Sequence, residues 1–84
     1  MNSKQRRTLL AVFTDPVAPG IVWNDIETLL QAVGCSVIEG SGSRVRFIKD
    51  GVMENFHRPH PKKEAKQYQV RIARAYLAKL GVTP

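Results

Sequence analysis

The dipeptide Asp50-Gly51 lies between two segments in which apolar and polar residues alternate. Alternation with a period of two is typical of a β-strand with one buried face, so residues 43–49 and 52–57 are predicted strands. Asp-Gly strongly favours a two-residue type I′ turn, which joins two antiparallel neighbours directly. A turn of this length sets the register of the hairpin, and the register decides which face of the sheet each side chain occupies.

The predicted register divides the hairpin into two chemically different faces. The pairs run outward from the turn as Lys49 with Val52, Ile48 with Met53, Phe47 with Glu54, Arg46 with Asn55, Val45 with Phe56 and Arg44 with His57. Directly opposed residues share a face. The mainly apolar face, which should pack on helices, carries Val45, Phe47, Val52 and Phe56, with Lys49 and Glu54 toward its ends. The other face is polar and basic and carries Arg44, Arg46, Asn55 and His57, with Ile48 and Met53 near the turn.

The remaining elements are predicted from apolar spacing and from turn residues. They are helices over residues 3–13, 25–33 and 64–80 and a further strand over 35–39. Ser3 and Asn24 are the expected N-caps of the first two helices. The order is therefore α-α-β-β-β-α. A three-stranded antiparallel sheet with helices on one face is a two-layer α+β fold, and 84 residues are enough for one such domain.

The charge of the chain points to a polyanionic partner. There are 13 basic and 7 acidic residues, and the net charge is +6. Residues 41–84 hold ten basic residues against three acidic ones, whereas the first half is close to neutral. This asymmetry is typical of a surface that binds nucleic acid. A solvated basic surface kept for solubility is the alternative.

Several classes of protein and site are not expected. Cys35 is the only cysteine, so no internal disulfide forms and a reducing, cytoplasmic location is expected. No apolar run has the length of a membrane span, and the N-terminus lacks the pattern of a signal peptide, so no membrane partner is predicted. Cys35, His57 and His60 can bind metals, but their spacing is unlike that of a zinc site. Neither a metal nor a cofactor is predicted.

The polar face combines groups that suit a phosphodiester. Arginine binds phosphate through two N–H groups, and histidine can act as a general acid or base near neutral pH. We predict that Arg44, Arg46 and Asn55 bind RNA and that His57 is the catalytic residue, with the 2′-hydroxyl of RNA as an internal nucleophile. The alternative is a solvated sheet face with chance polar residues. Further phosphate contacts are predicted for the lysines before the last helix, Lys62, Lys63 and Lys66.

Four segments together resemble the HicA toxin family. They are residues 23–30 (WNDIETLL), 42–47 (GSRVRF), 56–64 (FHRPHPKKE) and 78–82 (AKLGV). The similarity covers residues 22–82 as a core, so residues 1–21 form an N-terminal helix-plus-loop extension. It implies a fold like that of double-stranded-RNA-binding domains. It also implies a toxin of a type II toxin–antitoxin pair, an mRNA interferase that a HicB-type antitoxin neutralises by covering the active face.

One position departs from the family pattern. The family carries its catalytic histidine after Gly-Ser, where this chain has Arg44, and an arginine that stays charged cannot shuttle protons. His57 could supply the imidazole instead, and His60 matches a Pro-His position of the family. Three functions therefore stay open: a metal-independent endoribonuclease, an RNA-binding module that has lost the nuclease histidine, and a protein-binding module whose basic face meets an acidic partner.

Overall fold

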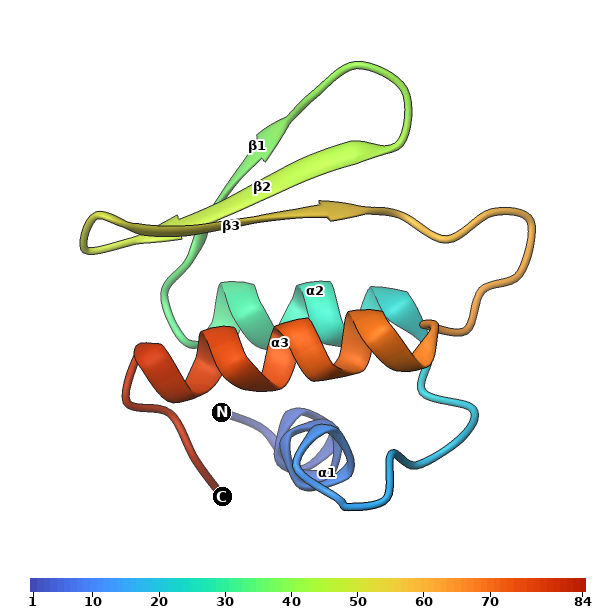
Figure 1. Ribbon diagram of the computed structural model, residues 1–84. Coiled ribbons are helices and arrows are strands. Elements are labelled where there is room, and N and C mark those ends of the chain that lie inside the picture. Colours follow the sequence, from blue (N-terminus) through green and yellow to red (C-terminus); the bar gives the residue numbers. More distant parts are fainter.

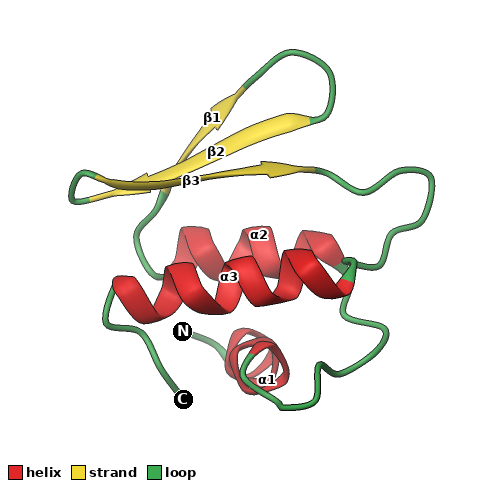
Figure 2. Ribbon diagram, in the orientation of Figure 1, coloured by secondary structure: helices red, strands yellow, loops and turns green.

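The computed structural model describes all 84 residues and shows three helices beside one antiparallel sheet (Figures 1 and 2). In chain order the elements are α1 (Ser3–Val12), α2 (Trp23–Ala32), β1 (Ser36–Glu39), β2 (Arg44–Lys49), β3 (Val52–His57) and α3 (Gln67–Lys79). The strands lie in the order β1-β2-β3. All helices lie on one side of the sheet, so the predicted α+β fold and its element order are confirmed.

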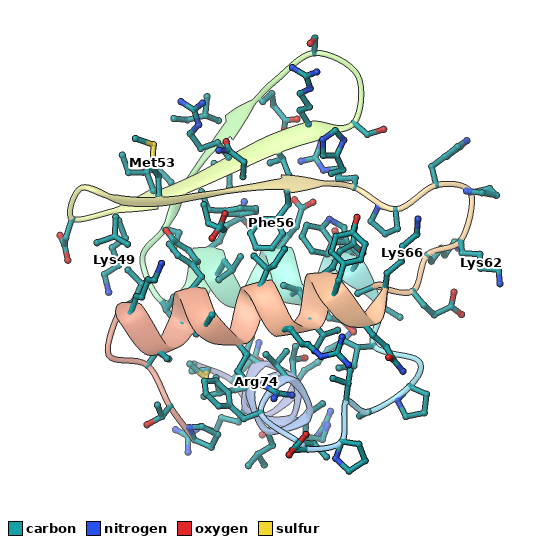
Figure 3. All side chains as sticks on the ribbon, viewed as in Figure 1. Lys49, Met53, Phe56, Lys62, Lys66 and Arg74 are labelled. Atoms are coloured by element: carbon teal, nitrogen blue, oxygen red, sulfur yellow. The ribbon has the colours of Figure 1, made fainter.

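The hairpin register is confirmed at all six predicted pairs, from Lys49 opposite Val52 to Arg44 opposite His57. The turn residues Asp50 and Gly51 have φ angles of 51° and 78°, as a type I′ turn requires. Figure 3 shows the consequence on β3, where Met53 projects away from the helices and Phe56 projects toward them. The polar residues of the hairpin are therefore on the side of the sheet that no helix covers, which we call the outer face.

The core lies between the sheet and the pair α2 and α3. Phe47 and Phe56 are buried on the inner face, with ring centroids 5.9 Å apart in an edge-to-face arrangement. Trp23 from α2 lies 5.0 Å from Phe56, and its indole N–H donates to the carboxylate of Glu27. Trp23 is only 5 % exposed. The interpretation of Trp23 as a packing residue rather than a platform for bases is confirmed.

The predicted start of α1 at Ser3 is confirmed, but its N-cap differs from the predicted one, and α2 and α3 begin at other residues than predicted. The N-cap of α1 is Asn2 rather than Ser3, because Asn2 exchanges hydrogen bonds with Gln5 at 2.8 and 2.9 Å. The α2 helix begins at Trp23, so Asn24 lies inside it and makes no cap.

The start of α3 was predicted three residues too early, because the chain before the helix pairs with another segment. The backbone N–H of Trp23 donates to Lys63 at 2.9 Å, and that of Ala65 donates to Ile21 at 2.7 Å. Glu64 forms an isolated antiparallel bridge with Val22. These contacts hold residues 63–65 extended, and α3 therefore begins at Gln67.

The N-terminal helix adds a layer beyond the core, since α1 packs on α2 and α3 on their side away from the sheet (Figure 1). Leu9 and Val12 are buried in this contact, and Lys4 forms an ion pair with Asp25 at 3.3 Å. Arg74 of α3 donates to the carbonyl oxygen of Val12, and to that of Thr14 beyond it, each at 2.8 Å (Figure 3). A cation from α3 therefore donates hydrogen bonds to backbone carbonyls at the C-terminal end of α1.

We expect Arg74→Met to lower the free energy of unfolding by about 1–2 kcal/mol, because the carbonyls at the end of α1 lose a charged donor. The methionine keeps the aliphatic contacts of the arginine. Amide hydrogen exchange should quicken in α1 while β2 stays protected. The matched control is Arg71→Met, an exposed arginine in the middle of the same helix. An equal loss in both variants would contradict the role of Arg74.

None of the three helices is both long and apolar enough to cross a membrane.

Candidate nucleic-acid interface

The outer face has a polar end, formed by Arg44, Arg46, Asn55 and His57. Arg44 lies directly opposite His57, and Arg46 lies opposite Asn55 in the next row. All four residues are exposed. Arg46 donates through Nε to the side-chain oxygen of Asn55 at 2.9 Å, which orients the guanidinium and leaves its two terminal nitrogens without a protein acceptor. The hairpin therefore brings together the four residues predicted for it.

The outer face also has an apolar end, nearer the Asp50-Gly51 turn. It is formed by Ile48 and Met53, which lie opposite each other, with Ser36 of β1 on the other side of Ile48. Ile38 is 47 % exposed and Met53 is 53 % exposed. Ile38 lies opposite Arg46, so this exposed apolar side chain shares a row with Arg46 and Asn55 of the polar end. No phenylalanine, tyrosine or tryptophan lies on this face.

The other predicted RNA-binding residues lie on the segment that follows β3. These exposed residues, which we call the basic segment, are His60, Lys62, Lys63 and Lys66. Figure 3 shows Lys62 at the outer bend of this segment and Lys66 beside the start of α3. The segment leaves the sheet at the same end as His57 (Figure 1). It is therefore adjacent to the polar end along the chain but is not part of the sheet.

Arg58 is the residue that the sequence analysis missed. It donates to both carboxylate oxygens of Glu27 in α2, at 2.7 and 3.1 Å, and to both of Glu39 in β1, at 2.6 and 2.9 Å. Because side chains alternate along a strand, the residue after His57 faces the helices. This alternation was a usable signal, and it separates Arg58 from the outer face.

Three of the ten basic residues in 41–84 serve the fold. Besides Arg58 and Arg74, Lys49 donates to the carbonyl oxygen of Val33 at the end of α2, at 2.7 Å. These three side chains make contacts inside the protein, so neither a polyanion-binding surface nor a solvated surface kept for solubility describes them. Most of the remaining positive charge lies on the polar end and the basic segment, which sharpens where a polyanion could bind.

The ion pair between Arg58 and Glu39 makes the stability of the folded protein depend on pH. Hydrogen bonds donated by Arg58 lower the pKa of Glu39 below its ordinary value of 4.5. Acceptance of these bonds by the carboxylates of Glu39 and Glu27 raises the pKa of Arg58, which stays cationic. A carboxylate with a depressed pKa stabilises the folded state above its unfolded pKa, and this contribution is lost as the pH falls through the folded pKa.

We therefore expect Glu39→Gln to be less stable than the parent protein at neutral pH, with the difference in unfolding free energy shrinking as the pH falls through the acid range and Glu39 is protonated. Urea unfolding of both proteins across this range is the measurement. A difference that stays constant with pH would show that the charge of Glu39 plays no part.

Cys35 and the two histidines do not converge on a common site. Cys35 is buried, as predicted, with its Sγ 3.7 Å from the Tyr76 hydroxyl, and burial raises the pKa of its thiol. His57 and His60 are exposed on the other side of the sheet and beyond its end. No group of three or more histidine, cysteine or acidic side chains could hold a metal ion.

Comparison with known proteins assigns most of the chain to one protein family. The family model described as the HicA toxin of bacterial toxin–antitoxin systems matches residues 23–82, which is well over half of the chain. Searches among curated proteins and among solved structures gave no match. The matched region contains α2, the whole sheet, the basic segment and α3, whereas α1 lies outside it. The chain therefore belongs to the HicA toxin family of bacterial toxin–antitoxin systems.

Proposed function

We propose that this toxin binds mRNA with the polar end of its outer face and with the basic segment, and that it cleaves the bound RNA. The observation that carries the proposal is the pair Arg44 and His57, directly opposed and exposed at one end of the hairpin. Residues 22–82 are the proposed functional core, and residues 1–21 are an extension docked behind it. The place of action is then the cytoplasm, where mRNA is found.

The proposed chemistry uses side chains and needs no metal ion. Arg44 and the terminal nitrogens of Arg46 bind the oxygens of the scissile phosphate. The neutral imidazole of His57 removes the proton of the adjacent 2′-hydroxyl, whose oxygen attacks phosphorus. The bond to the 5′-oxygen breaks, and that oxygen takes a proton from the imidazolium or from water. The products are a 2′,3′-cyclic phosphate and a 5′-hydroxyl.

A HicB-type antitoxin is the proposed protein partner, and the outer face is its proposed binding site. RNA-binding sheets commonly stack bases on phenylalanine, tyrosine or tryptophan side chains, whereas the imidazole of His57 is the one aromatic ring on this face. Exposed Ile38 and Met53 instead suit the apolar side chains of a protein. A partner covering both ends of the face would exclude RNA from Arg44 and His57.

A second candidate function is RNA binding without cleavage. It is favoured by Arg44, which stands where the family resemblance places the catalytic histidine and cannot exchange protons near neutral pH. Such a protein would act by occupying mRNA.

One experiment separates the two functions. Single-stranded RNA is incubated with purified protein in chelator, binding is followed by fluorescence anisotropy, and cleavage is followed on gels. We expect cyclic-phosphate products from the parent protein and a rate at saturating RNA that is lower by about 100-fold or more in His57→Ala. His60→Ala is the matched control and should weaken binding with little change of the saturated rate.

The remaining outcomes decide whether the protein cleaves RNA, only binds it, or does neither. Tight binding without products supports the non-catalytic function. Undiminished cleavage by His57→Ala removes His57 from the mechanism, and a protein that neither binds nor cleaves RNA overturns both proposals.

A further inference from the structure

The edge strand β3 is joined to α3 by a side-chain hydrogen bond at each of its ends. At the turn end, the hydroxyl of Tyr76 donates to the carbonyl oxygen of Val52 at 2.9 Å. At the polar end, Nε2 of Gln69 donates to the carbonyl oxygen of His57 at 2.6 Å. The two bonds have the same form, but only the second lies at the candidate site.

Both polar atoms of the Gln69 amide are hydrogen-bonded inside the protein. Gln69 is 2 % exposed, and its Oε1 accepts a hydrogen bond from the backbone N–H of Lys66 at 2.8 Å. Burial of an amide is unfavourable unless its groups are hydrogen-bonded, so a side chain serving only as packing would be apolar here. Gln69 therefore links two defined backbone points, one at His57 and one at Lys66.

The peptide unit between His57 and Arg58 is held from both sides. Gln69 binds its carbonyl oxygen, and its N–H donates to the carbonyl oxygen of Ser43 at 2.8 Å. With this peptide fixed, the Cα–Cβ bond of His57 has a defined direction toward the outer face, opposite Arg44. The imidazole itself has no protein partner and depends on its backbone for its position.

We propose that Gln69 is a positioning residue that holds the polar end and the basic segment as one rigid RNA-binding surface. It fixes His57 through the carbonyl oxygen and Lys66 through the backbone N–H, so the spacing between the sheet and the lysines does not vary. This inference rests on the proposed function. Its physical basis is preorganisation, since groups already held in place lose less freedom when RNA binds.

The test compares Gln69→Met with Tyr76→Phe, which removes the equivalent bond at the far end of the same strand. The first readout needs no RNA and is the hydrogen-exchange rate of the Arg58 amide. We expect this rate to rise in Gln69→Met and to stay at the parent value in Tyr76→Phe. The second readout is RNA affinity, expected to fall about tenfold in Gln69→Met and by less than about twofold in Tyr76→Phe.

A second variant covers the case in which Gln69→Met does not fold. Gln69→Asn keeps a neutral amide that can accept from the N–H of Lys66, but its side chain is one methylene shorter and does not reach the carbonyl oxygen of His57 as well. It should raise the exchange rate of the Arg58 amide while the amide of Lys66 stays protected. Parent-like exchange and affinity in a folded Gln69 variant would overturn the proposal, and so would equal losses in Tyr76→Phe. If the parent protein binds no RNA, the proposed function fails, while the exchange comparison still decides whether Gln69 holds His57.

Discussion

Arg58→Ala is expected to lower the free energy of unfolding by about 2–4 kcal/mol. Removal of Arg58 leaves the carboxylate of Glu27, whose side chain is 12 % exposed, without its cation. A fully buried pair broken in this way costs about 3–5 kcal/mol, and we expect less here because the Arg58 side chain is 35 % exposed and Trp23 still donates to Glu27. The loss is a large share of the roughly 4–13 kcal/mol typical of a chain this long.

Urea unfolding followed by circular dichroism measures this effect. The matched control is Arg71→Ala, an exposed arginine of α3 with only a 3.5 Å contact to Gln67, for which a change below about 0.5 kcal/mol is expected. Glu27→Gln combined with Arg58→Met should recover part of the loss, because the only carboxylate then left without its cation is the exposed one of Glu39. If Arg58→Ala changed the free energy of unfolding only slightly, water would be reaching Glu27 and replacing the guanidinium.

The double variant Arg44→Gln/Arg46→Gln is expected to weaken RNA binding about 25-fold at about 0.1 M salt. Each phosphate contact to single-stranded RNA contributes about 0.7 to the slope of log affinity against log salt, so the slope should become less steep by about 1.4. Both side chains are exposed, so stability should change by less than about 0.5 kcal/mol. Affinity measured across a salt series tests the two numbers together.

Arg6→Gln/Arg7→Gln is the matched control for this variant. It removes the same net charge from exposed positions of α1, which lies behind the helices and away from the outer face (Figure 1). Its affinity should change by less than about threefold, because charges far beyond the Debye length are screened. Equal losses in the two double variants would mean that RNA responds to net charge rather than to the polar end.

The sheet was predictable in detail because its determinants are local. A two-residue turn and the alternation beside it depend only on neighbours in the chain, and they yielded every hairpin pair and the composition of both faces. The helix starts were less predictable because they depend on distant partners. Nothing in residues 64–66 shows that a bridge to Val22 competes with the helix, and Asn24 has the right residue type but lies inside α2.

The residues of the candidate site were likewise predictable only where their position depends on local sequence. Arg44 and His57 were placed together by local register alone. Arg58 and Gln69, which hold that end of the sheet in place, were not identified, because their partners come from other elements. Glu27 and Glu39 precede Arg58 by 31 and 19 residues. The sequence alone therefore indicates which side chains could bind or cleave RNA. It does not indicate which side chains hold them in position, because those contacts form only in the folded protein.

The C-terminal ends of α1 and α2 are completed by residues that come much later in the chain. Neither helix has a basic residue in its own last turn. Arg74 supplies the cation for α1, and Lys49 supplies it for α2. Each helix has ten residues, fewer than the roughly 12–15 that an isolated helix needs. Folding should therefore be cooperative, with residues 1–34 unstructured as a fragment, and a ligand bound to the native sheet should protect helices that it never touches.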